Sequence, residues 1–229
     1  MDGVGTWAGH RVIELHAGAI DEIALLAAHC DDIAIGMGGT LLTLSGRRPG
    51  LRVRALVLTG AGTERESEER SALAALTPGA DLKVSVLGFP DGRIPEHWNA
   101  VKEALAAFRR ESRAAVVFAP QRADAHQDHR MLATLAPTEF RDHLLLGYEI
   151  IKWETDTPVP TVFHPLSDET ARAKAELIEA HYPSQCPHDW CDQETFLALA
   201  RIRGVQCRHR YAEGFVLEKA TINLGAATP

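Results

Sequence analysis

Two short segments carry side chains whose types and spacing suit metal-assisted chemistry. His29 and Asp32 lie three residues apart in LLAAHCDDIAIGMGGT, and His126 and His129 share that spacing in QRADAHQDH. Catalytic zinc sites commonly use three histidine or carboxylate ligands and leave one position open for water. Any three of these four side chains could supply such a set, and the remaining polar groups could then accept or donate protons.

Asp31 directly precedes Asp32, and adjacent carboxylates repel each other unless a cation lies between them. With a cation present, one carboxylate would be neutralised and the other would be available as a base. The alternative is that one aspartate caps the next helix, a common role for aspartate after a strand. A single histidine such as His126 or His129 is also commonly a loop or helix-start residue. The occurrence of two such clusters favours the metal site.

The glycines Gly36, Gly38 and Gly39 raise the alternative of a dinucleotide-binding loop. The G-x-G-x-x-G pattern fails because Leu41 stands where glycine or alanine is needed, and the glycines fall inside the expected helix rather than at its start. No G-x-x-x-x-G-K-[ST] phosphate loop occurs either. Close packing of the helix is the better interpretation of these glycines.

Apolar runs alternate with amphipathic segments, which predicts repeated β-α-β units. The expected strands are 22–28, 52–60, 81–89, 113–120, 143–153 and 211–219. The expected helices are 32–46, one within 64–79 that stops at Pro78-Gly79, 95–112, 130–140 with a bend or break at Pro137, 168–181 and 192–204. The fold class is therefore α/β, a Rossmann-like three-layer sandwich with a mostly parallel sheet, as a single domain over residues 1–229.

In parallel sheets, ligands bind beyond the carboxyl ends of the strands. The segment His29–Asp32 follows the first expected strand, Asp91 follows the third, and His126–His129 follows the fourth. All three polar groups should therefore gather at one edge of the sheet.

Composition and charge limit the classes of molecule that this protein is expected to bind. The 229-residue chain has a formal net charge of -7 and a pI near 5.9, which argues against a nucleic-acid or anionic-membrane binder. No apolar run approaches the ~20 residues of a membrane span. The first ten residues, MDGVGTWAGH, show no signal-peptide pattern. Four scattered cysteines predict reduced thiols and a cytoplasmic location. The oligomeric state stays open, a homo-oligomer included.

Several motifs resemble those of the PIG-L/LmbE family of metal-dependent N-acetylglucosaminyl deacetylases. AAHCDDIAIGMGGTL resembles the family's first motif, A-H-P-D-D-E-x-x-G-x-G-G-T, and HQDHR resembles its second motif, H-x-D-H. GFPDG, HYPSQ and YAEGF are further matches, so the resemblance covers nearly the whole chain. It implies a small-molecule substrate that carries an N-acetyl group on a sugar or sugar conjugate.

The resemblance also implies a role for each matching residue. The metal ligands would be His29, Asp32 and His129, holding Zn²⁺, Fe²⁺ or another divalent cation. Asp31 would be the general base. His126 would polarise the carbonyl or protonate the leaving amine, and Asp128 would orient a histidine.

Three further positions are implied as substrate contacts. They are Arg65, for which Arg70 is an alternative register, Asp91, and His181 at the start of HYPSQ.

Two positions depart from the family pattern. Cys30 replaces the usual proline, and Ile33 replaces the usual glutamate. A small buried residue is the favoured interpretation of Cys30, because free cysteine is commonly buried. The alternative is an oxidation-sensitive or metal-binding thiol. A second zinc site in QCPHDWC is disfavoured, because a fourth ligand is not obvious; a substrate-facing loop is expected instead.

The expected function is zinc-dependent hydrolysis that removes an N-acetyl group from an amino sugar or sugar conjugate. An amidase acting on a larger thiol–sugar conjugate is an alternative within the same family. A non-haem iron oxygenase would use the same two histidines and one carboxylate, but those sites commonly lie in all-β folds and have no use for Asp31. A non-catalytic binding module that kept the fold is disfavoured by the intact ligands and base.

Overall fold

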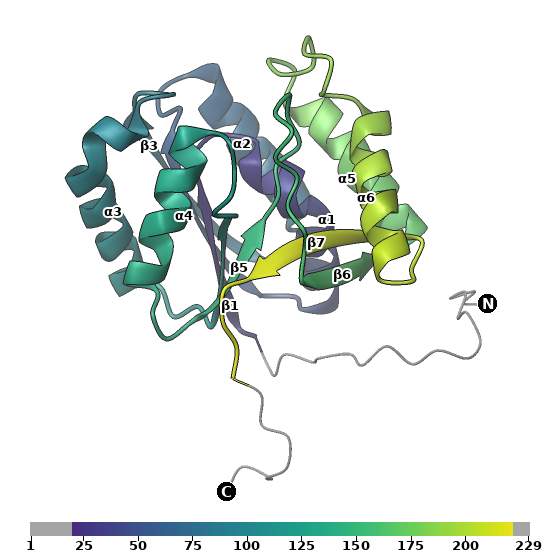
Figure 1. Ribbon diagram of the computed structural model, residues 1–229, viewed down its shortest axis with the longest axis horizontal. Coiled ribbons are helices and arrows are strands. Elements are labelled where there is room, and N and C mark those ends of the chain that lie inside the picture. The colour runs from purple at the N-terminus through teal and green to yellow at the C-terminus, as the bar shows by residue number, and fades with distance from the viewer. Residues whose placement is uncertain (1–19, 222–229) are drawn as a thin grey trace, which may run out of the picture.

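A seven-stranded sheet forms the centre of the computed structural model, which describes residues 20–221 (Figure 1). The strand order is β3-β2-β1-β4-β5-β7-β6. Strands β1 to β5 pair in parallel, and β7 runs antiparallel to both β5 and β6. The bounds are β1 Glu22–Ala27, β2 Arg52–Thr59, β3 Asp81–Phe89, β4 Val116–Pro120, β5 Leu144–Tyr148, β6 Val162–Leu166 and β7 Tyr211–Leu217.

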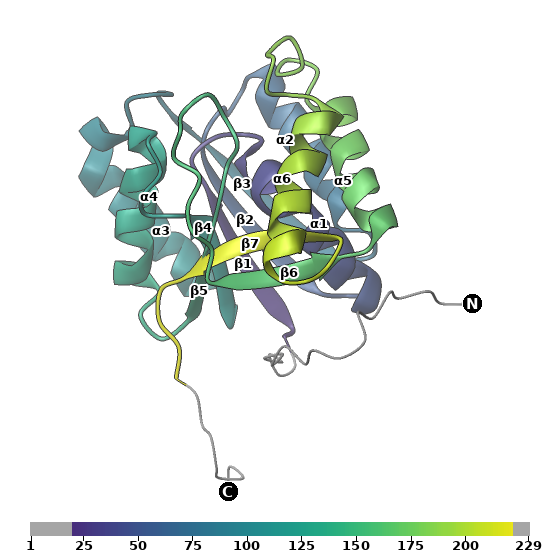
Figure 2. The same cartoon turned by 45° about the vertical axis from the view of Figure 1, so that its right-hand side comes forward.

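Helices cover both faces of the sheet and complete a three-layer α/β sandwich (Figure 2). On one face α1, α2, α5 and α6 contact one another, and α3 packs with α4 on the other. The bounds are α1 Asp32–Arg47, α2 Glu64–Leu76, α3 Trp98–Glu111 after the short 3-10 helix η1 Ile94–His97, α4 Gln127–Glu139, α5 Asp168–His181 and α6 Gln193–Gln206. The predicted fold class is confirmed.

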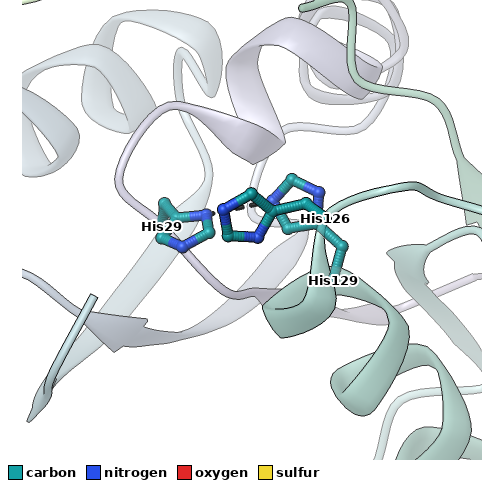
Figure 3. A group of neighbouring side chains, drawn as sticks. All are labelled: His29, His126 and His129. Carbon is teal, nitrogen blue, oxygen red and sulfur yellow. Dashed lines mark hydrogen bonds between the residues drawn. The ribbon is translucent and has the colours of Figure 1, made fainter. Parts of the chain in front are cut away.

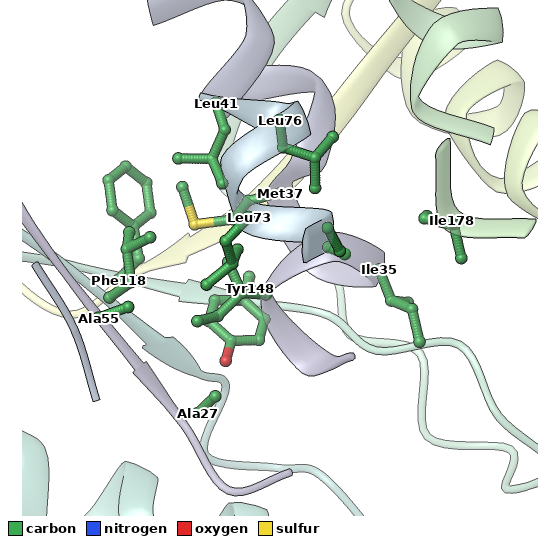
Figure 4. Close-up of a cluster of buried hydrophobic side chains, with 14 of the residues drawn as sticks. Ala27, Ile35, Met37, Leu41, Ala55, Leu73, Leu76, Phe118, Tyr148 and Ile178 are labelled. Atoms are coloured by element: carbon green, nitrogen blue, oxygen red, sulfur yellow. The ribbon is translucent and has the colours of Figure 1, made fainter. Parts of the chain in front are cut away.

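Strand β1 is buried on both faces, as its continuous apolar run indicates. Ile23, Leu25 and Ala27 belong to the larger core under α1, α2, α5 and α6. Their alternating neighbours Ala24 and Leu26 belong to the second core under α3 and α4. Figure 4 shows part of the larger core, where side chains of β1 and α1 meet those of α2, β4 and β5.

The glycines of α1 allow close packing, which confirms their predicted role. A Cβ atom on Gly36 would lie 2.3 Å from the Tyr148 ring of β5. A Cβ on Gly39 would lie 2.6 Å from a methyl group of Leu166 in β6. Both distances are far below van der Waals contact, so α1 can approach the sheet only because these side chains are absent.

Several boundaries differ from the sequence-based expectation. Helix α4 begins at Gln127, three residues earlier than predicted, and continues through Pro137 to Glu139 without a break. Strand β5 ends at Tyr148, and β6 was not predicted at all. The N-terminal residues considered for a signal peptide lie outside the described part of the chain. Among residues 20–221, none of the helices has the length and apolarity that crossing a bilayer requires.

Candidate metal centre and its cleft

The site lies where the order of the strands reverses. From β1 the chain proceeds outward through β2 and β3, then returns to pair β4 with the other side of β1. The segments that follow β1 and β4 therefore leave the sheet side by side, at the crevice where doubly wound sheets bind ligands. The first segment supplies His29 and Asp32, and the second supplies His126 and His129.

Three side-chain atoms converge at this crevice. His29 Nδ1 lies 3.0 Å from His129 Nε2, and Asp32 Oδ1 lies 3.2 Å from His129 Nε2 and 3.8 Å from His29 Nδ1. All three residues are buried. Figure 3 shows the histidines turned toward one another, with His29 on the loop after β1 and the other two at the start of α4.

These three atoms fit a divalent cation. Ligands about 2.0–2.1 Å from a tetrahedral zinc ion stand about 3.3 Å apart, close to the three distances found here. Two imidazoles and one carboxylate are also a donor set that zinc and ferrous iron accept. His29, His126 and His129 form one of the potential metal-binding groups among the described residues; His29 with Asp91, His126 and Asp128 forms the other.

In each candidate histidine ligand, the ring nitrogen that faces away from the converging atoms lies next to a carboxylate. His29 Nε2 lies 3.1 Å from Asp128 Oδ2 and 3.1 Å from Asp91 Oδ1, and His129 Nδ1 lies 3.0 Å from Asp124 Oδ1. Such partners fix the ring orientation and make the facing nitrogen more basic. Asp128 thus lies beside His29, one of the two candidate histidine ligands. Asp124 is a residue that the sequence analysis missed.

Backbone amides orient the candidate carboxylate ligand, Asp32. Asp32 Oδ2 accepts hydrogen bonds from the amides of Ala28 and His29, both at 2.9 Å, which leaves Oδ1 to face the histidines. The side chain thus reaches back toward the end of β1, while the side chain of Asp31 at the N-cap makes no capping hydrogen bond. Asp31 is therefore the N-cap residue of α1 by position, but neither carboxylate of the pair caps the helix with its side chain.

The histidines hold protons tightly in the absence of a cation. Burial lowers the pKa of His129, but Asp32 and Asp124 outweigh it and raise this pKa to about 9. Burial opposes protonation of His29 too, and Asp128 and Asp32 nonetheless raise its pKa well above the ordinary value. A site that attracts protons through its carboxylates also attracts a cation, and protons and metal compete for the same nitrogens.

Asp31 adopts an unusual backbone conformation beside the candidate ligands. Its φ of 118° lies in the region that few residues other than glycine adopt. Asp31 Oδ2 accepts a hydrogen bond of 2.9 Å from Arg65, which also donates to the Cys30 carbonyl. Burial raises the pKa of Asp31 to about 7, against the opposing effect of the Arg65 guanidinium. A carboxylate with this pKa is well suited to act as a base near neutral pH.

Glu69, a buried glutamate of α2, holds the backbone of Asp31 in place. Glu69 Oε2 accepts hydrogen bonds from the Asp31 amide at 2.9 Å and from the Tyr182 hydroxyl at 2.6 Å. Burial raises the pKa of Glu69 to about 8. Sequence analysis did not single out this residue, because it lies in the charged run ERESEER and looks like part of a solvated helix face.

His126 is the N-cap residue of α4 and lies beside both candidate histidine ligands. Its Nδ1 accepts a hydrogen bond from the Asp128 amide at 3.3 Å. The proton of the neutral ring is therefore on Nε2, where it can be donated. Burial and the positive charges of His129 and His29 lower the pKa of His126, so the ring is neutral near pH 7. Its ring centroid lies 4.8 Å from that of His29 and 4.7 Å from that of His129.

A cleft of about 360 Å³ opens over these residues. Arg65 and Asp91 line it near the candidate ligands, and the range 150–154, with Gln185 and Trp190, lines the remainder. Asp91 is largely exposed, its side chain 62% accessible, so it can contact a bound molecule. The loop containing QCPHDWC thus faces the cleft, as predicted.

Two of the expected substrate contacts, Arg65 and His181, lie differently relative to the cleft. Arg65 lies at the site, whereas Arg70 pairs with Glu66 and the Val84 carbonyl on the surface, which removes the alternative register. His181 is not among the residues lining the cleft, and its Nδ1 lies 2.9 Å from Ser71 Oγ between α5 and α2, so its position does not support the expected substrate contact. The last residue of α5 points toward α2, and the loop that follows reaches the cleft instead.

Both departures from the family pattern occupy buried positions. Cys30 is 1% exposed, its thiol donates to the Thr59 carbonyl, and burial raises its pKa far above the ordinary value. The favoured interpretation of a small buried residue is therefore confirmed. Ile33 packs in the larger core.

Comparison with known proteins places this site in a family. Residues 24–138, half of the chain, match the PIG-L family, described as GlcNAc-PI de-N-acetylase. The chain belongs to the PIG-L family. This PIG-L protein is similar to a diacetylchitobiose deacetylase of Thermococcus kodakarensis, with 29% identity over an alignment that covers 85% of this chain and 82% of the relative.

Solved structures share this fold. A conserved protein of Thermus thermophilus superposes with a TM-score of 0.69 and 27% identity, covering 92% of this chain and all of that one. An N,N'-diacetylchitobiose deacetylase of Pyrococcus horikoshii, bound to an inhibitor, superposes with a TM-score of 0.65 and 21% identity, covering 86% of this chain and 84% of that one. The enzyme class predicted from the motifs, an amide hydrolase of the N-deacetylase type, is confirmed.

Proposed function

We propose that this PIG-L protein is a zinc-dependent deacetylase that removes the N-acetyl group from an amino sugar within a larger conjugate. The observation that carries the proposal is the set of three converging atoms from His29, Asp32 and His129, with the buried Asp31 carboxylate beside it. A bound divalent cation would lower the pKa of water and polarise an amide carbonyl.

The chain's own side chains divide the proton transfers between them. Asp31, with Arg65 holding one carboxylate oxygen, would accept a proton from the attacking water. His126, neutral and protonated on Nε2, would donate a hydrogen bond to the developing oxyanion and would be placed to protonate the departing nitrogen. Asp128 would keep the His29 ring in one orientation throughout.

The substrate would contact both ends of the cleft. Asp91 and Arg65 lie near the ligands, where the hydroxyl groups of the acetylated sugar would be held. Farther along the cleft, Trp153 and Trp190 present rings at 87° to each other, and Trp153 is 63% exposed. Exposed indole faces at a cleft rim suit a further ring attached to the amino sugar. The relatives that act on diacetylchitobiose support a conjugate of this kind.

The position of Asp31 favours a hydrolase over an iron oxygenase, because an oxygenase needs no base at that point. The α/β fold supports the same choice. We therefore retain a single reaction class.

The decisive experiment measures acetate release from N-acetylglucosamine, di-N-acetylchitobiose and their nucleotide or aglycone conjugates. The protein should be stripped with a chelator and reloaded separately with Zn²⁺ and Fe²⁺. We expect release that depends on the metal and equals the free amine formed. Metal-loaded protein that releases no acetate from any of these compounds would refute the proposal, and oxygen uptake with Fe²⁺ would establish the rival reaction.

A further inference from the structure

Two thiols lie in contact beside the cleft, in the loop between α5 and α6. Cys186 Sγ lies 3.4 Å from Cys191 Sγ. The other two cysteines have different partners: Cys30 and Cys207 each donate to a backbone carbonyl. In Figure 2 the loop rises above α5 and α6, at the same end of the molecule as the carboxyl ends of the parallel strands.

Each of the two cysteines is adjacent in the chain to a residue that lines the cleft. Gln185 and Trp190 line the cleft, and the two cysteines are the residues that directly follow them. Between the cysteines, His188 stacks on Trp190 with an interplanar angle of 17°. Asp189 Oδ1 accepts a hydrogen bond of 2.7 Å from Trp153 Nε1, which joins this loop to the segment that follows β5.

We propose that Cys186 and Cys191 form a reversible disulfide with small cellular disulfides as the oxidant, and that this bond fixes the wall of the cleft that carries Trp190. The sulfur atoms need to close from 3.4 Å to about 2.0 Å. Consecutive turns already bring the two residues together: the Cys186 amide bonds to the Tyr182 carbonyl, and the Cys191 amide bonds to the His188 carbonyl.

The two thiols differ in solvent exposure, and this difference determines which of them reacts first with the small disulfide. Cys186 is partly exposed, whereas Cys191 is 4% exposed. Burial and the neighbouring sulfur raise the pKa of Cys191 to about 12, so this thiol is a poor nucleophile toward solvent reagents. Cys186 is therefore the attacking residue, and Cys191 reacts second because its target is already in contact with it.

The exchange balances in two steps. The Cys186 thiolate attacks one sulfur of a low-molecular-weight disulfide, so that a mixed disulfide forms and one small thiol leaves. Cys191 loses its proton, attacks the Cys186 sulfur and displaces the second small thiol. The protein loses two electrons and two protons as the pair of thiols becomes one disulfide, and the reagent gains both to become two thiols.

Oxidation would close a six-residue ring that contains Trp190. This disulfide-closed loop would reduce the number of conformations open to residues 186–191 and would hold the Trp190 indole against Trp153 and His188. It leaves the candidate metal ligands untouched, because they lie on the segments after β1 and β4. The disulfide is also independent of the proposed function, since its formation does not depend on which substrate the cleft takes.

The test equilibrates the intact protein with graded ratios of reduced to oxidised glutathione, quenches with acid and maps disulfides by mass spectrometry. We expect one internal bond, between Cys186 and Cys191, that reducing agent reverses. Cys191→Ser should instead accumulate one glutathionyl group on Cys186, and Cys191→Ala serves if the serine variant unfolds. Cys207→Ser, which removes a partly exposed thiol without a sulfur neighbour, should behave as wild type.

Two results would overturn the proposal. One is wild-type protein in which Cys207 becomes glutathionylated while Cys186 and Cys191 stay reduced. The other is a bond in which either thiol pairs with a different cysteine. Hydrogen exchange tests the second half of the proposal: amides in 186–191 should exchange more slowly after oxidation, and unchanged exchange rates would show that the disulfide does not fix the wall.

Discussion

Replacement of Asp31 by asparagine should separate catalysis from metal binding. Asparagine is the appropriate replacement because Asp31 has a φ of 118°, and asparagine tolerates positive φ better than alanine does. Its side-chain oxygen can still accept the hydrogen bond from Arg65. It cannot accept a proton from water, so only the basic function is removed.

The expected loss of rate follows from the role of a general base. Such a group contributes about 10²–10⁴-fold, and at about 1.36 kcal/mol for each factor of ten the barrier should rise by about 2.7–5.4 kcal/mol. Metal content should stay at the wild-type value, because Asp32 is oriented by the amides of Ala28 and His29 and not by the Asp31 side chain.

The assay pairs kcat for acetate release with metal content measured on the same sample. Glu154→Gln is a matched control, because Glu154 lines the same cleft without contacting the candidate ligands. An Asp31→Asn variant that retains kcat within about threefold of wild type at equal metal content, against the larger factor expected of a base, would show that Asp31 is not the base. Loss of metal in proportion to loss of rate would instead make Asp31 a ligand.

Three further predictions address the support of the metal, the cleft wall and the core. Asp124→Asn should weaken metal affinity by about 10–100-fold in competition with a chelator, because its carboxylate backs a ligand imidazole; unchanged affinity would contradict this role. Trp190→Ala should lower kcat/KM for di-N-acetylchitobiose more than for N-acetylglucosamine, while Trp98→Ala, exposed on α3, should change neither. Gly36→Ala should lower the free energy of unfolding by about 1–3 kcal/mol in urea titration, because its Cβ has no room. Gly46→Ala in the same helix meets open space and should raise it by up to about 1 kcal/mol, so equal effects of the two changes would refute the packing argument.

The sequence predicts the bounds of those helices and strands whose hydrophobic pattern alone determines where they begin and end. Strands β1 and β3 and helix α5 have nearly the predicted bounds, because each is a periodic or continuous apolar segment ended by polar, proline or glycine residues. The gathering of the candidate site residues at one edge follows from the same logic, since strand ends must meet at the switch point of a parallel sheet. The choice of His29, Asp32 and His129 among them comes from the resemblance to the family.

The missed features depend on tertiary contacts. Strand β6, VFHPL, is short and contains a proline, and it is recognisable as a strand only through its pairing with β7 at the sheet edge. Helix α4 begins early because His126 caps it, a role that histidine rarely has. Asp124 lies in the segment QRADAHQDH, five residues before His129. The sequence alone does not show that the chain turns back there and brings the Asp124 carboxylate to the His129 ring.

The converging atoms also connect distant parts of the chain. His29 and His129 are 100 residues apart, so no local segment of an unfolded chain can present this set of ligands. A cation bound here would act as a cross-link between the two halves of the sheet, and it would bind the folded chain far more strongly than the unfolded one. Each tenfold rise of free metal above its dissociation constant would then stabilise the fold by about 1.4 kcal/mol. Metal supply would in this way set what fraction of the enzyme is folded, in addition to whether it turns over.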